Sequence, residues 1–235
     1  MSLKDKNIIL SVIVPCFNEI KTISSVVDNI LNSPINLLEI IIVDDFSSDG
    51  SREFLKNLKN EKIKTIFHDK NLGKGAALSN GISLARGKII IIQDADLEYD
   101  PNEYPNIISP ILDGKADIVY GSRFQGGQPH RVVYFWHRIG NGLLTLLSNI
   151  FTDLNLTDME TCYKAFRSDI IKKIPIEEKR FGFEPEITAK ISKLNCRIYE
   201  VGISYYGRTY EEGKKIRPHN AINVLITIIL KRIFR

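Results

Sequence analysis

The sequence predicts a single α/β domain with a mostly parallel central sheet and helices on both of its faces. Short β-branched runs alternate with helix-like stretches through the first half of the chain, which is the pattern of repeated strand–helix units. The chain has 235 residues and is 43% hydrophobic, which suffices to bury one large core. A charged fraction of 26% is ordinary for a globular protein and argues against disorder.

The elements can be justified in chain order. Five β-branched runs are expected to form strands, at 8–14, 38–43, 63–67, 89–92 and 116–120. Apolar residues at helical spacing predict helices at 22–31, through 54–58 and at 76–85. Pro15 is expected to end the first strand, Ser48 or Asp49 to cap the second helix, and Gly87 to stop the third. After Gly121 the pattern weakens to a polar loop, an apolar stretch at 139–151 and shorter elements.

Polar residues follow three of the expected strands: PCFNE at 15–19, DDFSSDG at 44–50 and QDADLE at 93–98. Ligands of such sheets bind beyond the carboxyl ends of the strands, so these segments should line one crevice. Asp45 can accept the ring N–H of uracil or guanine, and Glu19 and Asp49 can bind other polar groups of a nucleotide. A helix cap or turn is the alternative role for Asp49.

Asp94 and Asp96 leave a strand of four isoleucines, so a buried sheet edge fixes their backbone. Two carboxylates this close repel each other and favour a cation between them. Mg²⁺ and Mn²⁺ prefer oxygen ligands and bridge carboxylates to substrate phosphates. The pair therefore predicts a divalent metal site, although Asp-X-Asp triplets also occur by chance in turns.

The sequence NLGKG at 71–75 precedes the third expected helix. Its glycines allow backbone N–H groups to approach a ligand, and helix N-termini attract anions. The spacing of a Walker A motif is absent, and a tight turn explains the glycines equally well.

In these motifs the chain resembles glycosyltransferase family 2, in its branch of dolichyl-phosphate mannose synthases and polyprenyl-phosphate glycosyltransferases. Seven segments carry the resemblance in order: VPCFNE at 14–19, VDDFSSDG at 43–50, NLGKG at 71–75, DAD at 94–96, GSRF at 121–124, TDMETCYK at 157–164, and 208–216. The resemblance implies a single GT-A-type nucleotide-sugar-binding domain over residues 1–216. It also implies inverting transfer of a hexose from a donor of the GDP-mannose or UDP-glucose type to a polyprenyl or dolichyl phosphate.

The resemblance also assigns roles to residues of this chain. The donor-binding set is Pro15, Phe17, Glu19, Asp45, Lys74, Asp94, Arg208 and Lys214. The metal, Mg²⁺ or Mn²⁺, is expected on Asp94 and Asp96. Many relatives have Gln where this chain has Glu98, whose carboxylate either joins the metal or faces water.

On the acceptor side, the resemblance places Arg123 and Arg138 on the acceptor phosphate, with Arg131 as a competing match for Arg138. Arginine pairs bidentately with phosphate oxygens, which suits this role, while a surface position is the plain alternative. Asp158 and Glu160 match an acidic pair with acceptor-side chemistry. Asp158 is expected to act as a base or as an acceptor positioner, and a helix-capping role is the alternative.

Basic charge gathers at the C-terminal end. From Arg208 onward, seven Lys and Arg residues against two Glu give +5, which leaves about −1 for the rest of a chain with net charge +4. Residues 217–235 are expected to form a basic amphipathic helix that lies on an anionic membrane, since its apolar run is too short to span one. Packing against the core is the alternative. An anionic partner fits this charge, and we expect no nucleic acid partner.

Three widely spaced cysteines, without a C-x-x-C pair, argue against a disulfide framework or a structural zinc site. The first seven residues lack the apolar core of a secretory signal. We therefore expect a cytoplasmic enzyme, peripheral on the inner face of a membrane, which acts alone or with a separate membrane-protein partner.

Two other functions remain open on the sequence. An enzyme of the same fold could act on a glycan or another hydroxyl acceptor in surface polysaccharide synthesis. Alternatively, the chain could be a non-catalytic nucleotide-sugar-binding subunit.

Overall fold

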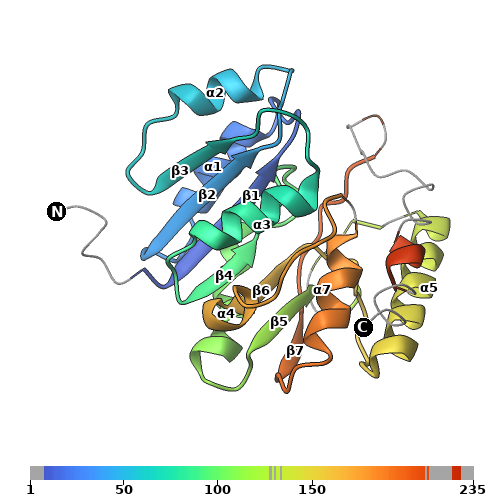
Figure 1. Cartoon of the computed structure of the whole chain (residues 1–235). Coiled ribbons are helices and arrows are strands. Elements are labelled where there is room, and N and C mark those ends of the chain that lie inside the picture. Colours follow the sequence, from blue (N-terminus) through green and yellow to red (C-terminus); the bar gives the residue numbers. More distant parts are fainter. Residues whose placement is uncertain are drawn as a thin grey trace.

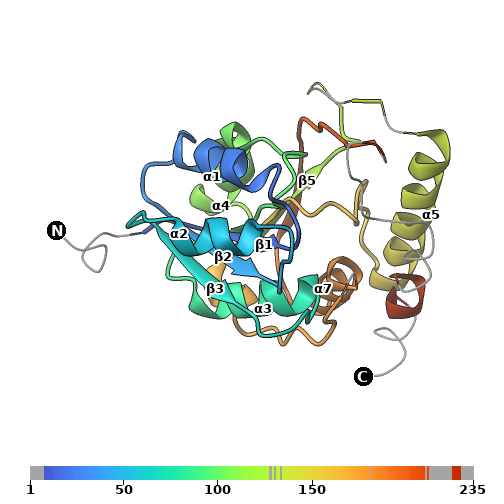
Figure 2. The ribbon, with the colours of Figure 1, turned by 90° about the horizontal axis from the view of Figure 1, so that it is seen from above.

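The computed structural model describes residues 8–126, 129, 131–132, 134–180, 182–209, 211 and 224–228. A single seven-stranded sheet runs through this part of the chain, with helices on both faces (Figures 1 and 2). The strands are β1 (Leu10–Cys16), β2 (Leu38–Asp44), β3 (Ile63–Phe67), β4 (Ile89–Ile92), β5 (Ile118–Ser122), β6 (Lys164–Arg167) and β7 (Ile198–Gly202). The helices are α1 (Ile23–Leu31), α2 (Ser51–Asn57), α3 (Lys74–Leu84), η2 (Pro101–Glu103), α4 (Tyr104–Leu112), α5 (Phe135–Thr152), α6 (Ser168–Ile171) and α7 (Phe183–Ile191).

The strand order is β3-β2-β1-β4-β6-β5-β7. Strand β6 runs antiparallel to both β4 and β5, and the other neighbouring strands pair in parallel. The prediction of a mostly parallel sheet is therefore confirmed. Strands β6 and β7 lie in the segment where the sequence pattern is weak.

Two hydrophobic cores cover the sheet, one on each face. On one face β1 and β2 pack against α1, α2 and α4, through residues such as Val12, Ile40 and Ile107. On the other face α3 and α7 pack against the sheet, and Ile13, Leu78 and Ile187 are buried there. Alternate residues of the buried strands thus feed both cores, which explains why the strands are apolar throughout.

Several predicted element bounds differ from the structure by one or two residues. Strand β1 continues through Pro15 to Cys16, because β4 has already ended beside Ile13 and no neighbour there needs the N–H that proline lacks. Helix α3 begins at Lys74, two residues before the expected start, since Gly73 precedes it with a φ of 97°. Strand β5 covers Ile118–Ser122 rather than 116–120.

The predicted C-terminal helix, 217–235, lies mostly outside the described residues. Within 224–228 a short helical stretch is described, and Val224 and Ile228 are buried in the core that contains α7. Ile226 is exposed. This stretch packs against the protein, and a membrane role for the rest of the segment stays a prediction. None of the helices in the described part of the chain combines the length and apolar character needed to cross a bilayer.

Candidate active site

The carboxyl ends of β1 and β4 bring acidic side chains together, as the sequence predicts. Arg208, which follows β7 in the chain, reaches this edge and joins the two strand ends. Its Nη1 donates to Glu19 Oε2 at 3.1 Å, and its Nη2 donates to Asp96 Oδ2 at 3.1 Å. Residues nearly two hundred positions apart therefore share one charged cluster.

Asp94 has a different cationic partner. The Nζ atom of Lys74, at the start of α3, lies 3.0 Å from Asp94 Oδ1 and 3.1 Å from Glu184 Oε1. It also donates to Cys162 Sγ at 2.8 Å. Burial acts to lower the pKa of Lys74, but Asp94, Cys162 and Glu184 hold it well above its ordinary value. Lys74 is therefore a fixed cation, and Glu184 and Cys162 are members of the site that the sequence analysis did not assign.

Asp96 is the carboxyl group of this cluster whose ionised form is disfavoured. Burial, together with the nearby Asp94 and Glu98 carboxylates, raises the pKa of Asp96 to about 8, although Arg208 acts against the shift. The two cations beside the cluster thus do not balance its carboxylates. A further positive charge would stabilise the ionised pair.

Glu98, expected either to join the metal or to face water, is largely buried, and both of its carboxylate oxygens accept hydrogen bonds from the protein. Its Oε2 accepts from the Tyr205 hydroxyl at 2.8 Å, and its Oε1 accepts from the Arg208 backbone N–H at 2.8 Å. The carboxylate therefore holds the segment that delivers Arg208 to the site. No group of three or more metal-ligating side chains is preformed within the described ranges.

Asp45 is buried at the end of β2 and organises the glycine loop. Its two oxygens accept from the backbone N–H groups of Leu72 and Gly73, each at 2.7 Å, and Oδ1 lies 2.8 Å from His68 Nδ1. Phe17 is 40% exposed and follows the neighbouring end of β1. The predicted contact of Asp45 with a base thus competes with three contacts inside the protein.

The glycine loop contacts protein rather than presenting open backbone to an anion. Gly75 N–H donates to Arg180 O and Ala76 N–H to Lys179 O, at 3.3 and 3.2 Å. A Cβ atom at Gly75 would stand 1.9 Å from Glu178 O. These glycines therefore allow a close approach of two backbone segments, which favours the tight-turn explanation of this motif.

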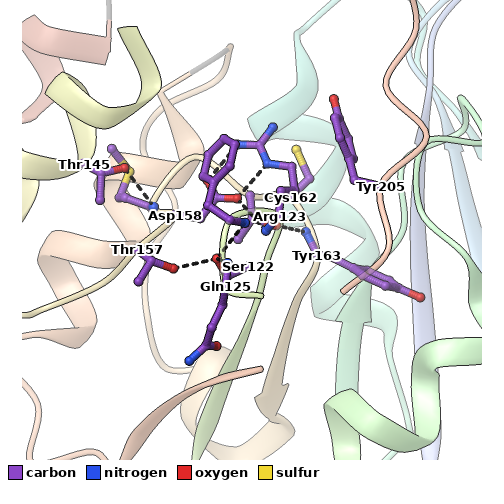
Figure 3. Close-up of polar contacts among 12 residues, drawn as sticks. Ser122, Arg123, Gln125, Thr145, Thr157, Asp158, Cys162, Tyr163 and Tyr205 are labelled. Atoms are coloured by element: carbon purple, nitrogen blue, oxygen red, sulfur yellow. Dashed lines mark hydrogen bonds and ion pairs between the residues drawn. The ribbon is translucent and has the colours of Figure 1, made fainter. Parts of the chain in front are cut away.

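On the other side of the site, Arg123 and Asp158 form a bidentate ion pair (Figure 3). Arg123 Nε and Nη2 each donate to an Asp158 oxygen at 2.7 Å, and the Arg123 backbone N–H donates to the same carboxylate at 3.0 Å. Asp158 is fully buried, and Arg123 is 8% exposed. The expected phosphate clamp and the expected base are thus partners of each other.

Glu160 lies beside this pair with its Oε1 buried and without a hydrogen-bond partner among the described residues. Burial raises the pKa of Glu160 to about 8, and the nearby Glu184 adds to the shift. Lys164, fully buried at the start of β6, donates its Nζ to Met159 O at 2.9 Å. Lys164 is a further charged group that the sequence analysis did not assign.

Arg138 and Arg131, the two alternatives for the second acceptor arginine, lie in different settings. The Arg138 guanidinium lies 3.8 Å from the centre of the Phe124 ring, and Arg123 packs on the same ring at 5.3 Å. Arg131 donates its Nη1 to Gly207 O at 3.1 Å. Arg138 thus shares a partner with Arg123. Lys214, the last expected donor-binding residue, lies outside the described residues.

Comparisons with known proteins agree with this geometry. A sequence model described as glycosyl transferase family 2 matches residues 11–175. The undecaprenyl-phosphate mannosyltransferase of Micrococcus luteus is 28% identical over 216 residues, which cover 86% of this chain and 85% of that protein. The dodecaprenyl-phosphate galacturonate synthase of Rhizobium johnstonii is 26% identical over 211 residues, 87% of this chain and 61% of that protein.

Among solved structures, glucosyl-3-phosphoglycerate synthase from Mycobacterium tuberculosis, in complex with Mn²⁺, uridine diphosphate and phosphoglyceric acid, superposes with a TM-score of 0.72. The sequences are 19% identical, and the match covers 97% of this chain and 79% of that one. This likeness confirms the predicted GT-A-type fold.

Proposed function

The chain belongs to glycosyl transferase family 2, and from that premise we propose that it moves a hexose from a nucleoside diphosphate sugar to a polyprenyl phosphate. The observation that carries the proposal is the pairing of two charged clusters at one edge of the sheet. One is an acidic cluster in which Asp94 and Glu98 lie near Asp96. The other is built on Arg123. Two relatives whose names specify polyprenyl phosphates support the acceptor class.

The acidic cluster fits a divalent metal. Mg²⁺ and Mn²⁺ bind through one or two carboxylates plus substrate phosphates, and Asp94 and Asp96 supply that set. Burial, with the nearby Asp94 and Glu98 carboxylates, raises the pKa of Asp96 to about 8, and a bound cation would favour its ionised form. Bound there, the metal would act as a Lewis acid toward the departing diphosphate. The solved neighbour described above holds Mn²⁺ together with its nucleotide.

Arg208 and Lys74 would serve the donor from the protein side. Both already lie beside the carboxylates, through the 3.1 Å contact to Asp96 and the 3.0 Å contact to Asp94. A diphosphate bound at this edge of the sheet would offer them oxygen acceptors and neutralise part of their charge. Each charge-assisted bond of this kind contributes about 1.5–3 kcal/mol.

Arg123 would position the acceptor. Its pair with Asp158 uses Nε and Nη2, and in this proposal Nη1 would serve a phosphate oxygen. A phosphate monoester is ionised at neutral pH, and its oxygen can attack the anomeric carbon without a base. The new C–O bond forms as the bond to the nucleoside diphosphate breaks, with inversion at that carbon. In this scheme Asp158 fixes the guanidinium and removes no proton.

One observation favours a hydroxyl acceptor as the second candidate function. A hydroxyl needs a base, and a pKa near the working pH suits that task. Glu160, whose pKa is raised to about 8, is a carboxylate with such a value beside the acceptor cluster. We propose this role for Glu160 only if the acceptor is a sugar.

Radiolabelled donors offered with Mn²⁺ to a short-chain prenyl phosphate and, separately, to free sugars test the proposal. We expect transfer to the prenyl phosphate, abolished in Asp96→Asn and retained in Asp69→Asn, whose exposed carboxylate follows β3 at the same edge. Transfer to sugars alone would establish the second candidate. Donor binding without turnover to either would establish a non-catalytic subunit. The donor is identified by the nucleotide sugar that raises the melting temperature most.

A further inference from the structure

Helix α5 turns one series of its apolar side chains away from the protein. One series of large apolar residues recurs every three or four positions and therefore lies along one face: Phe135, Ile139, Leu143, Leu146 and Ile150. These side chains are between 49% and 67% exposed. The inward-facing side of the helix instead buries Thr145 and Ser148. Leu144 and Phe151 pack against the core from the inner side. Helix α5 is therefore apolar on two sides, whereas the usual surface helix has one apolar stripe that faces the core.

The first turn of α5 adds aromatic and basic residues to this surface. Tyr134 and Trp136 are 56% and 79% exposed, and Val132 is 90% exposed. Arg131 and Arg138 are exposed beside them, and the sequence has no Asp or Glu between 131 and 152. We call Val132, Tyr134, Phe135, Trp136, Ile139, Leu143, Leu146 and Ile150 the outer face of α5. Figures 1 and 2 both show α5 at the periphery, on the side of the molecule away from β3.

The inner side of α5 forms hydrogen bonds with the loop that contains Asp158, the partner of Arg123. Thr145 Oγ1 accepts from the backbone N–H of Met159 at 3.2 Å, next to Asp158 (Figure 3). The Asn149 side chain both donates to and accepts from the backbone of Leu156, at 2.8 and 3.1 Å. The same helix therefore has the apolar outer face on one side and, on the other, hydrogen bonds to the loop that contains Asp158.

We propose that the outer face of α5 docks on a lipid bilayer with anionic headgroups, with the helix lying in the headgroup region. Apolar side chains would enter the acyl boundary, tyrosine and tryptophan would lie at the headgroups, and the arginines would pair with lipid phosphates. The inference rests on the proposed function, because a prenyl phosphate is embedded in such a bilayer and docking would present Arg123 to it. A second copy of the chain is disfavoured as the occupant, since this surface offers no acidic residue to pair with its own arginines.

Trp136 is the only tryptophan in the chain and reports on docking directly. With phosphatidylcholine vesicles that contain phosphatidylglycerol, we expect its emission to shift to the blue and to be quenched by brominated lipids, more strongly than with phosphatidylcholine alone. The double variant Leu146→Gln, Ile150→Gln keeps the reporter and should lower partitioning at least about tenfold, the change that 1.4 kcal/mol produces. The matched control is Leu84→Gln, Leu112→Gln, at exposed leucines on α3 and α4, and it should partition as the wild type does.

Two acceptors separate this inference from the proposed function. With a short-chain prenyl phosphate free in solution, the α5 double variant should turn over as the wild type does. With a long-chain acceptor in vesicles, its turnover should fall with its partitioning. Equal partitioning of the double variant and the wild type overturns the docking inference, as does a dimer in sedimentation that the double variant dissolves. Vesicle binding without transfer to either prenyl phosphate overturns the proposed function and leaves docking intact.

Discussion

The proposed donor half of the site surrounds Asp94 and Asp96, and the proposed acceptor half surrounds Arg123 and Asp158. Buried charges are compensated differently in the two halves. In the donor half, Asp94 and Asp96 end a parallel strand, and their cations are the tips of Lys74 and Arg208, brought in from other segments. In the acceptor half, Arg123 and Asp158 satisfy each other through three hydrogen bonds in full burial. In our proposal, the donor half would gain a further positive charge from the metal ion that binds with the ligand. The Arg123–Asp158 pair is a structural unit that any ligand must share.

The largest expected effect tests that structural unit. Asp158→Asn leaves Arg123 buried beside a neutral group, and loss of one partner of a buried pair costs about 3–5 kcal/mol. We expect the free energy of unfolding in urea to fall by that amount. The control is Asp113→Asn, in an exposed pair with Lys115, which should change it by less than about 1 kcal/mol. Equal effects of the two variants would show that the Arg123–Asp158 pair does not support the fold.

In the donor half, Asp96→Asn should lower activity without lowering stability. Loss of the charge should lower kcat/KM at least about 100-fold, comparable to the loss of one electrostatic group at a reacting centre. Because the Asp96 carboxylate is repelled by Asp94 and Glu98, the metal-free protein should melt no lower than the wild type. Calorimetry and steady-state kinetics measure the two quantities. A lower melting temperature with full activity would break the contrast between the halves.

Arg208→Gln should have a smaller kinetic effect, a roughly 10- to 100-fold lower kcat/KM, equivalent to about 1.5–3 kcal/mol of charge-assisted bonding. Removing this cation leaves Glu19 and Asp96 less compensated, so Mn²⁺ should raise the melting temperature of the variant more than that of the wild type. Arg197→Gln, which removes an arginine paired with Asp117 at the start of β7, serves as the control. Unchanged activity in Arg208→Gln would remove this residue from the donor site.

The smallest expected effect concerns pH. The pKa of Glu160 is raised from 4.5 to about 8, chiefly by burial. Between these values the folded protein holds a proton that the unfolded chain has released, so stability should fall as pH rises from about 4.5 to about 8. Glu160→Gln should flatten melting temperature against pH over this interval. Asp96 has a shift of the same sign and leaves a residual slope. An unchanged slope in the variant would place the ionisation of Glu160 outside this range.

The donor half could be predicted from the sequence because its logic is local. Strand β4 is four isoleucines, and a buried parallel strand fixes where the next carboxylates lie. Counting along the chain therefore placed Asp94 and Asp96 correctly at the strand end. The cationic partner of Asp96, however, is Arg208, which lies far along the chain. Only the family resemblance connected Arg208 to the donor site.

The acceptor half depended on topology that the sequence does not show. Strand β6 enters between β4 and β5 and runs antiparallel, which breaks the regular alternation and carries Lys164 into the core. Glu184 is buried on α7, where eight of nine residues are buried, and its partner Lys74 comes from the start of α3. The signal available in the sequence was a charged residue inside an otherwise apolar element. Such a residue indicates a buried charge, but it identifies neither the residue that pairs with it nor the distance between them.

The glycine loop has a consequence for how the gene can vary. A methyl group at position 73 or 75 would collide with the carbonyl oxygens of Lys179 and Glu178, at 2.3 and 1.9 Å. At those two positions the loop at 71–75 packs directly against the backbone of residues 178–179. Neither glycine has a side chain that could contact a substrate. In a library of all single substitutions, positions 73 and 75 should accept glycine alone. A ranking of sites by their intolerance to substitution would therefore place these two structural glycines among the catalytic residues.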